Sequence, residues 1–426
     1  MKIIADFHIH SRYAMACSKS ITIKGIEAAS LNKGINIVGT GDFTHPEWLS
    51  EIKRDLEKGK GEGLYKVKGS NSGVLFVLST EVSTIFEQDK KIRKIHHCIL
   101  VDDIEKAEEL NGKLANFGNL SSDGRPTLSM SAAELVETVM NVDKESFVFP
   151  SHVWTPWFSV FGSMSGFDSI KEAYEDKAKH IYAYESGLSS DPKMNWRISE
   201  LDKYSLISNS DSHSLEKIGR EANVFDIEGV SYKKIIAAIK QKDPNKFKST
   251  IEFYPEEGKY HYDGHRNCNF SIDPSNEETA ICPVCGKRLV LGVLHRVNDL
   301  ADRPAGYIPK GAIPYVNLIP LIEIISYVEH KSVYSESVKR MKNIIISKFG
   351  NEFNAVMNAD LNDIKETEGV NPEIASAIGN IRANSVHITP GYDGVYGKID
   401  IIYKDNENRQ ESAKKPKQSG LSKFLS

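Results

Sequence analysis

The N-terminal segment ends in Asp6, His8 and His10, a pattern of alternate residues that could bind a metal ion. Alternate side chains of a strand point to one face, so these three groups lie together if the segment is extended. Imidazole and carboxylate groups are ligands for Zn²⁺, Mn²⁺ and Fe²⁺. A histidine near a strand end often only hydrogen-bonds a neighbour, so the remaining sequence has to decide between the two roles.

Seven short apolar runs in the first 245 residues predict strands, and helical patterns lie between several of them. The runs cover residues 2–7, 35–42, 73–81, 95–101, 146–152, 180–186 and 204–211. The helical patterns cover residues 21–34, 129–141 and 230–241, and Gly34 is a stop signal for the first. Strands that alternate with helices imply an α/β fold with a parallel sheet or a barrel. A barrel places its functional side chains at the C-terminal ends of its strands.

Residues of metal-ligand type follow almost every one of these runs. They are His8, His10, Asp42, Glu81, His96, His97, His152, Glu185, Asp211 and His213. The set exceeds the needs of one tetrahedral ion, so we expect two or three divalent ions (Zn²⁺, Mn²⁺ or Mg²⁺) with Glu81 able to bridge them. Such ions activate water and stabilise a leaving oxygen, which indicates phosphoester hydrolysis.

The pattern resembles the polymerase and histidinol phosphatase (PHP) superfamily. The matching residues are His8, His10, Glu81, His97, His152, Asp211 and His213. The resemblance implies a distorted (β/α)7 barrel with three ions. One ion would bind His8, His10, Glu81 and Asp211, a second Glu81, His97 and His152, and a third Asp42 and His213. His45 could also reach the third ion, and strand parity alone leads us to choose His97 over His96.

The composition changes at about residue 258, where a loop-rich segment contains His265, Cys268, Cys282 and Cys285. The spacing H-x-x-C, thirteen residues, C-x-x-C predicts a structural zinc site, although His261 could replace His265. Residues 317–329, 335–350 and 371–384 predict helices. We therefore predict a barrel in 1–245, a zinc-binding module in 258–312, a helical region in 313–403 and a polar tail in 404–426.

Two late segments suggest partners. Residues 367–382 resemble half of a helix-hairpin-helix DNA-binding element, in which Gly369 and Val370 match the turn and Asn371 replaces a glycine. An ordinary helix with Pro372 in its first turn explains the segment equally well. The tail resembles the peptide that binds sliding clamps of the PCNA type. Its matching residues are Gln418, Leu421, Phe424 and Leu425, preceded by Lys414, Lys415 and Lys417.

The order of these segments resembles the endonuclease Q family across nearly the whole chain. That resemblance implies an endonuclease that cuts single- or double-stranded DNA 5′ to uracil, hypoxanthine, xanthine or an abasic site. We predict Asp211, His213 and His10 as catalytic residues. We predict that the substrate contacts Asn209, Glu185, Ser189, Trp154 and Trp157. Glu185 and Asn209 could instead orient metal ligands, and the aromatic loop could be a packed lid.

Composition excludes several other classes. The 426 residues imply two to four domains, with the 40% hydrophobic and 26% charged content of a soluble globular protein. No run approaches the roughly 20 apolar residues of a membrane span, and the N-terminal apolar stretch is too short for a signal peptide. We therefore expect a cytoplasmic monomer without a membrane partner. The net charge of −4 means that a DNA-binding surface must be a local patch.

Three other functions agree with part of the sequence. They are a phosphatase for small phosphomonoesters, a 3′ exonuclease and a DNA-binding scaffold without activity. The phosphatase leaves the zinc-binding module and the tail unexplained, and the nearly complete ligand set argues against the scaffold.

Overall fold

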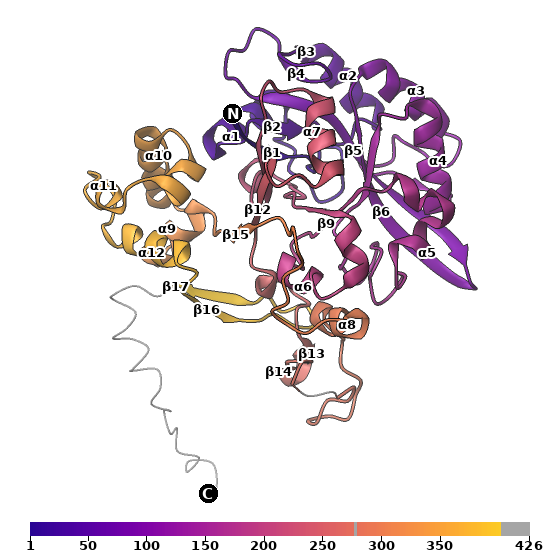
Figure 1. Cartoon of the computed structure of the whole chain (residues 1–426). Helices are drawn as coiled ribbons and strands as arrows, with labels where there is room; N and C mark the ends of the chain where they lie inside the picture. The colour runs from indigo at the N-terminus through magenta and orange to yellow at the C-terminus, as the bar shows by residue number, and fades with distance from the viewer. Residues whose placement is uncertain (277–278, 402–426) are drawn as a thin grey trace, which may run out of the picture. The chain divides into compact units, whose positions relative to one another are not determined.

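The computed structural model describes residues 1–276 and 279–401, which divide into two compact units (Figure 1). Among the described residues, the first unit contains residues 1–318 and 389–398, and the second contains residues 319–388 and 399–401. The predicted tail, including Gln418, Leu421, Phe424 and Leu425, lies outside the described residues. The four predicted segment boundaries remain predictions.

An 11-stranded sheet forms the frame of the first unit. Its main path is β15-β12-β11-β1-β2-β5-β4-β3, with β6 and β7 paired to β5 and β8 paired to β6. The strands are β1 (Lys2–Asp6), β2 (Ile37–Gly39), β3 (Leu56–Lys58), β4 (Tyr65–Val67), β5 (Leu75–Gln88), β6 (Lys91–Val101), β7 (Thr127–Leu128), β8 (Phe147–Pro150), β11 (Ala222–Asp226), β12 (Phe247–Glu252) and β15 (Tyr315–Asn317). Two further strands, β9 (Ala183–Glu185) and β10 (Ser205–Ile207), pair with each other in parallel. Each of the seven predicted runs contains a strand, so the predicted α/β class is confirmed.

Not all of the barrel strands are parallel. β1, β2 and β5 pair in parallel, whereas β5 and β6 form a long antiparallel hairpin and β6 pairs antiparallel with β8. His96 and His97 therefore lie within β6, and His97 pairs with Val82 while His96 pairs with Ser83. This register decides which of the two histidines shares a face with Glu81.

Helices cover the sheet of the first unit (Figure 1). They are α1 (Ile23–Lys33), α2 (Pro46–Asp55), α3 (Ile104–Leu114), α4 (Ala132–Val142), α5 (Ile170–Tyr174), α6 (Pro192–Asn195) and α7 (Tyr232–Gln241). α7 buries Tyr232, Ile235, Ile236 and Ile239, which recur at helical spacing and join the core formed by the strands. The Ser231 side chain accepts a hydrogen bond at the start of this helix.

The cysteine-rich segment also belongs to the first unit. It contains β13 (Asp263–His265), β14 (Phe270–Ile272) and α8 (Val293–Leu300). Arg303 binds Asp202 and the Arg197 guanidinium donates to Asn298, which fixes the end of α8 against the barrel. Residues 389–398 return to this segment, where the Tyr262 amide donates to the Gly391 carbonyl.

The second unit is mainly helical. It contains α9 (Leu321–Glu329), α10 (Glu336–Phe349), α11 (Leu361–Lys365) and α12 (Glu373–Arg382), and β16 (Val386–Thr389) pairs with β17 (Lys398–Ile401). Gly369 has a φ of 79°, which suits the predicted turn between α11 and α12. The Asn371 side chain accepts from the Glu373 amide and donates to Glu329, so it caps α12, and DNA binding by this turn stays a prediction. Among the described helices, none has both the length and the apolar content needed to cross a bilayer.

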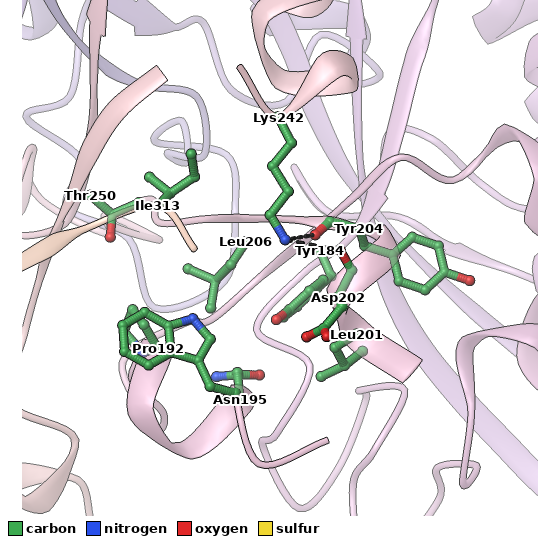
Figure 2. A pocket seen from close by; sticks show the side chains of 11 residues that line it. Tyr184, Pro192, Asn195, Leu201, Asp202, Tyr204, Leu206, Lys242, Thr250 and Ile313 are labelled. Carbon is green, nitrogen blue, oxygen red and sulfur yellow. Dashed lines mark hydrogen bonds between the residues drawn. The ribbon is translucent and has the colours of Figure 1, made fainter. Parts of the chain in front are cut away.

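A small pocket lies beside β10 and α6 (Figure 2). Lys242 crosses it and donates hydrogen bonds to the carbonyls of Asp202 and Tyr204. Its volume of about 20 Å³ holds one water molecule and is too small for a nucleotide base. The pocket is therefore part of the frame and not a substrate site.

A buried carboxyl group, Glu252, ties β12 to the ends of β9 and β10. It accepts hydrogen bonds from Ser208, Thr250 and Ser186. Burial raises its pKa from 4.5 to about 7 although these bonds oppose the shift. A raised carboxyl pKa stabilises the native state at low pH, and that stabilisation is lost as the pH rises through 7.

We expect Glu252→Gln to flatten the dependence of stability on pH. Between pH 5 and 7.5, the wild type should lose about 2 kcal/mol of unfolding free energy that the variant retains. Urea titrations of both proteins at the two pH values measure this difference. Equal losses in both proteins would contradict it.

Candidate functional site

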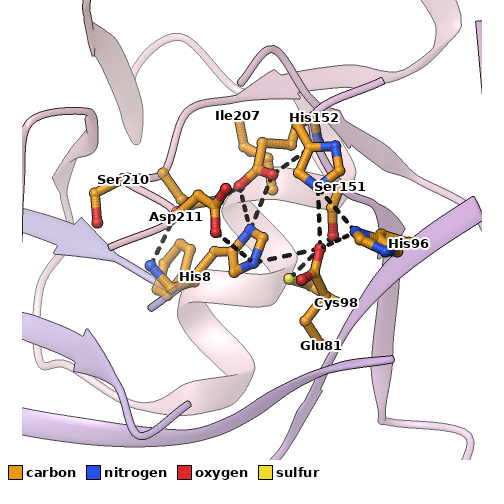
Figure 3. Close-up of polar contacts among 12 residues, drawn as sticks. His8, Glu81, His96, Cys98, Ser151, His152, Ile207, Ser210 and Asp211 are labelled. Carbon is orange, nitrogen blue, oxygen red and sulfur yellow. Dashed lines mark hydrogen bonds and ion pairs between the residues drawn. The ribbon is translucent and has the colours of Figure 1, made fainter. Parts of the chain in front are cut away.

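The segment after β1, the middle of β5 and the segment after β10 bring four predicted ligands together, of which Figure 3 labels His8, Glu81 and Asp211. One ligand atom from each of His8, His10, Glu81 and Asp211 lies within 4.8 Å of the others. His10 Nε2 is 3.1 Å from Asp211 Oδ1 and 3.3 Å from Glu81 Oε2. His8 Nε2, His10 Nε2, Glu81 Oε1 and Asp211 Oδ1 are buried without a hydrogen-bond partner in the described chain. A divalent ion requires several nitrogen or oxygen atoms that converge and have lone pairs free for coordination. These four buried atoms meet that requirement, so the group fits a metal ion.

The other nitrogen of each histidine is held by a carboxylate. His8 Nδ1 lies 3.0 Å from Glu185 Oε2, and His10 Nδ1 lies 2.9 Å from Asp42 Oδ1. This arrangement directs each Nε2 toward the centre and raises its basicity as a ligand. Burial lowers the pKa of His10, but Asp42, Asp211 and Glu81 outweigh burial and raise it well above its usual value. The centre therefore favours positive charge.

A second group shares Glu81 with the first. It contains Glu81, His96 and His152, whose ligand atoms also lie within 4.8 Å of one another. Glu81 Oε1 is 3.3 Å from His96 Nδ1 and 3.2 Å from His152 Nε2. Glu81 is thus placed to bridge two ions, as the sequence predicts.

His97 does not reach this centre, and the prediction that it is a ligand was wrong. Residues opposite each other in an antiparallel pair share a face, so His96 and Cys98 lie on the Glu81 side and His97 on the other. His97 is fully buried with Nε2 2.9 Å from the Thr84 hydroxyl and Nδ1 2.7 Å from the Tyr174 hydroxyl. Both of its nitrogens are therefore already used.

This difference predicts distinct metal contents for two neighbouring variants. We expect His96→Ala to lose one barrel ion, because it removes a ligand of the second group. We expect His97→Ala to keep the ions and to lose about 1–3 kcal/mol of stability, because it empties a buried site. Metal-to-protein ratios from mass spectrometry measure the first effect. If His97→Ala lost an ion and His96→Ala did not, His97 would be the ligand, as strand parity predicted.

The predicted third ion has less support. Asp42 is fully buried and accepts from the Ser11 amide at 2.6 Å in addition to its contact with His10. His213 lies with its ring 4.7 Å from that of His10, and its Nδ1 is 2.9 Å from the Asp211 carbonyl. Neither residue joins another ligand in a group of three among the described residues. The third ion, and a role for His45 in it, stay predictions.

Glu185 and Asn209 support the metal ligands, which corrects their prediction as substrate contacts. Glu185 accepts from the His152 amide at 2.8 Å and from Asn209 Nδ2 at 2.9 Å. Asn209 Oδ1 accepts from the Phe7 amide at 2.9 Å and from Asn223 at 3.0 Å. Both side chains are fully buried and engaged, so they cannot contact a base.

The predicted aromatic contacts divide in two. Trp154 is buried, and its indole N–H donates to Asn195 at 2.8 Å, so it packs within the barrel and its prediction as a substrate contact is corrected. Trp157 is 44% exposed on the same loop. Ser189 is half-buried on the loop after β9, and its role stays a prediction.

Arg125 lies in the candidate site, and the sequence analysis missed it. Its guanidinium lies 3.1 Å from Glu81 Oε2 and is mostly buried beside the metal ligands. A Cβ added to Gly124 would lie 2.4 Å from Asp42 Oδ2, so only glycine allows the loop to approach this closely. The Gly124 amide and the Tyr13 carbonyl hold the loop in place. No motif or periodicity marks this loop, so only the fold reveals the arginine.

An arginine here is suited to bind a phosphate oxygen beside the ions. We expect Arg125→Gln to lower the rate of cleavage at saturating DNA by roughly 100-fold, the typical effect of losing one preorganised donor. The barrel metal content should be retained, since Arg125 is not a ligand. A variant with an unchanged rate would contradict this role.

The predicted zinc ligands also lie together. One atom from each of His265, Cys268, Cys282 and Cys285 is within 4.8 Å of the others, and His261 is not part of the group. Cys285 Sγ is 3.3 Å from His265 Nδ1. Burial acts against ionisation of Cys282, but the amides of Cys285 and Val284 outweigh it and lower its pKa to about 6. The four residues fit a structural zinc ion.

Known proteins match this chain over part of its length or over nearly all of it. Residues 320–385 match the family described as the MJ0043 C-terminal domain. Uncharacterized protein MJ0043 of Methanocaldococcus jannaschii is 34% identical over 270 residues, which are 60% of this chain and 33% of that protein. The chain thus spans about a third of the length of that relative. Uncharacterized protein YqxK of Bacillus subtilis is 27% identical over 412 residues, which are 93% of this chain and 99% of that protein.

The crystal structure of the lesion-specific endonuclease PfuEndoQ from Pyrococcus furiosus matches with a TM-score of 0.82. The two are 33% identical over 94% of this chain and 96% of that chain. The chain belongs to the endonuclease Q family. A structure of endonuclease Q with a 27-mer duplex that has an abasic lesion at the active site matches with a TM-score of 0.81, 32% identity and 94% and 97% coverage. Endonuclease Q membership and the buried His, Glu and Asp groups establish a metal-dependent nuclease.

Proposed function

We propose that this chain cuts one DNA strand 5′ to a deaminated base (uracil, hypoxanthine or xanthine) or an abasic site, leaving a 3′-hydroxyl and a 5′-phosphate. The observation that carries the proposal is the pair of groups that share Glu81 in a chain matched along 94% of its length by endonuclease Q. The matched endonuclease Q structure with an abasic duplex supports the same class of substrate.

Ions bound at the two groups would activate water and neutralise the charge that develops on the phosphate. Asp42 and Glu185 keep His10 and His8 oriented, and Arg125 binds a non-bridging phosphate oxygen. His213 has a side chain that is 33% exposed beside His10, and its Nδ1 donates to the Asp211 carbonyl, so its Nε2 can accept the proton of the attacking water while solvent water protonates the leaving 3′ oxygen. No side chain is required as a nucleophile.

The test uses the purified full chain with Mn²⁺, Mg²⁺ or Zn²⁺ and three end-labelled duplexes. The duplexes contain one internal uracil, one internal tetrahydrofuran that mimics an abasic site, or no lesion. A single incision 5′ to each lesion supports the proposal. A ladder of products from the 3′ end would indicate an exonuclease. Cleavage of the undamaged duplex as fast as the lesion duplexes would show that the enzyme does not recognise a lesion.

We further propose that the tail binds a sliding clamp of the PCNA type. The support is the sequence pattern of Gln418, Leu421, Phe424 and Leu425. Titration of a labelled peptide of residues 414–426 with the clamp tests it, with Phe424→Ala as the control peptide. Equal affinities of the two peptides would contradict the assignment.

A further inference from the structure

A series of aromatic side chains leads from the second metal group to the cysteine-rich segment. The Phe158 ring centre is 4.7 Å from that of His96, and the next residue along the series, Trp157, is 44% exposed. The Trp157 and Tyr260 rings are 6.1 Å apart at 77°. Tyr396, which is 65% exposed, continues the series on the returning segment. We call Phe158, Trp157, Tyr260 and Tyr396 the aromatic track.

Gly394 joins the last two members of the aromatic track. A Cβ added to Gly394 would lie 3.8 Å from the Tyr260 hydroxyl and 3.3 Å from the Arg266 guanidinium. Tyr396 follows two residues later, and Lys259 Nζ lies 4.6 Å from the centre of its ring. The track therefore consists of neighbours in space that come from three distant segments, all within the first unit.

Cations accompany the rings. Lys94 Nζ is 5.3 Å from the centre of Phe158, Lys259 lies over Tyr396, and Arg266 lies beside Gly394. Within residues 1–276 and 279–401, the side-chain charges of these three residues form no ion pair, while the Asp393 carboxylate accepts from the Arg266 amide at 2.7 Å. Exposed rings with unneutralised cations between them are typical of surfaces that bind nucleic acid, because rings stack on bases and cations bind phosphates.

The protein holds the aromatic track in a fixed shape. Phe158 has a φ of 60°, a strained conformation for a bulky residue that persists only when its surroundings impose it. Arg296 of α8 donates to the carbonyls of Phe161 and Phe167, which fixes the loop that carries Trp157. The Gly394 amide donates to the Lys259 carbonyl at 2.9 Å, which fixes the other end. A preorganised surface loses little entropy when it binds a ligand.

We propose that the aromatic track binds unpaired nucleotides of the cleaved strand as they leave the duplex beside the scissile bond. Bases stack on Trp157, Tyr260 and Tyr396, and phosphates bind Lys94, Lys259 and Arg266. Paired bases present no free faces to such rings, so the occupant is a single-stranded segment. This assignment rests on the proposed function, since it takes the metal centre as the place where that strand is cut.

The test measures DNA binding in the full chain with Asp211→Asn, so that cleavage does not interfere. The probes are a tetrahydrofuran duplex with four unpaired nucleotides next to the lesion and the fully paired, undamaged duplex. Fluorescence anisotropy should show that Trp157→Ala and Tyr396→Ala each weaken binding of the first probe by about 5- to 150-fold, the range for one stacked base. Lys259→Ala should lower the salt slope of log Kd by about one. Tyr334→Ala, which removes an 81% exposed ring of the second unit, is the matched control and should change neither affinity.

A second measurement separates contact from indirect effects. With 5-iodouracil among the unpaired nucleotides, irradiation should crosslink the DNA to Trp157, Tyr260 or Tyr396, identified by mass spectrometry. Equal affinities of the track variants and Tyr334→Ala, or crosslinks confined to other residues, would overturn the proposal. Failure of the wild type to cut DNA at lesions would overturn the proposed function. The binding and crosslinking experiments do not depend on cleavage, so they test the aromatic track separately.

Discussion

Replacement of Glu81 by Gln should abolish strand cleavage. Glu81 Oε1 lies 3.5 Å from His8 Nε2 and 3.2 Å from His152 Nε2, so a single carboxylate serves both metal groups. An amide carries no charge and is a poor bridging ligand, so both groups should lose affinity for ions. Because metal ions contribute several kcal/mol to such reactions, we expect single-turnover cleavage of an abasic duplex to slow by at least about 1,000-fold.

Metal analysis of Glu81→Gln should show losses from both barrel sites, with the zinc of the cysteine-rich segment retained. Glu87→Gln is the matched control, because Glu87 is exposed on the same strand and belongs to neither group. Circular dichroism checks that both variants are folded. Two barrel ions bound to Glu81→Gln at wild-type affinity would show that Glu81 does not bridge them.

Replacement of Cys282 by Ser should unfold the cysteine-rich segment while the barrel stays folded. Cys282 is the fully buried member of its ligand group, and structural zinc contributes roughly 10–16 kcal/mol to the folding of small zinc modules. We expect the variant to lose one zinc ion and to become sensitive to trypsin between residues 258 and 300. The weaker support for Tyr260 should also lower DNA affinity.

Cys17→Ser is the control for this change, because Cys17 is a half-buried free thiol outside the ligand groups of the described chain. It should retain the zinc and the resistance to trypsin. A Cys282→Ser protein that still binds zinc stoichiometrically would show that three ligands suffice to hold this fold.

Local pattern was enough to predict the elements of the barrel and most residues of its two candidate metal groups. Each apolar run contains a strand because a short, continuous apolar run that ends in polar residues is a local signal for a strand buried on both faces. His8, His10, Glu81, His152 and Asp211 could be chosen because metal-ligand types cluster at the ends of these runs. The zinc ligands were predictable because knuckle spacing is local.

Features set by register and by tertiary contact could not be predicted in this way. The choice between His96 and His97 depends on the β5–β6 hairpin, whose antiparallel register reverses the face that an isolated strand suggests. Asn209 and Glu185 have the right chemistry to bind a base, and only their partners show that both are already engaged. Arg125 enters the site through a close backbone approach at Gly124, which leaves no pattern in the sequence.

The return of residues 389–398 to the first unit has a consequence for truncated forms of the chain. A protein that stops before residue 389 retains the barrel but loses the carbonyl of Gly391 that accepts from Tyr262, and it exposes Gly264 where the Tyr392 ring now packs. Catalytic fragments designed by cutting at Leu318 would therefore be incomplete, although they contain every metal ligand. The helices between Leu318 and Thr389 are therefore, in topological terms, an insertion in the chain of the first unit.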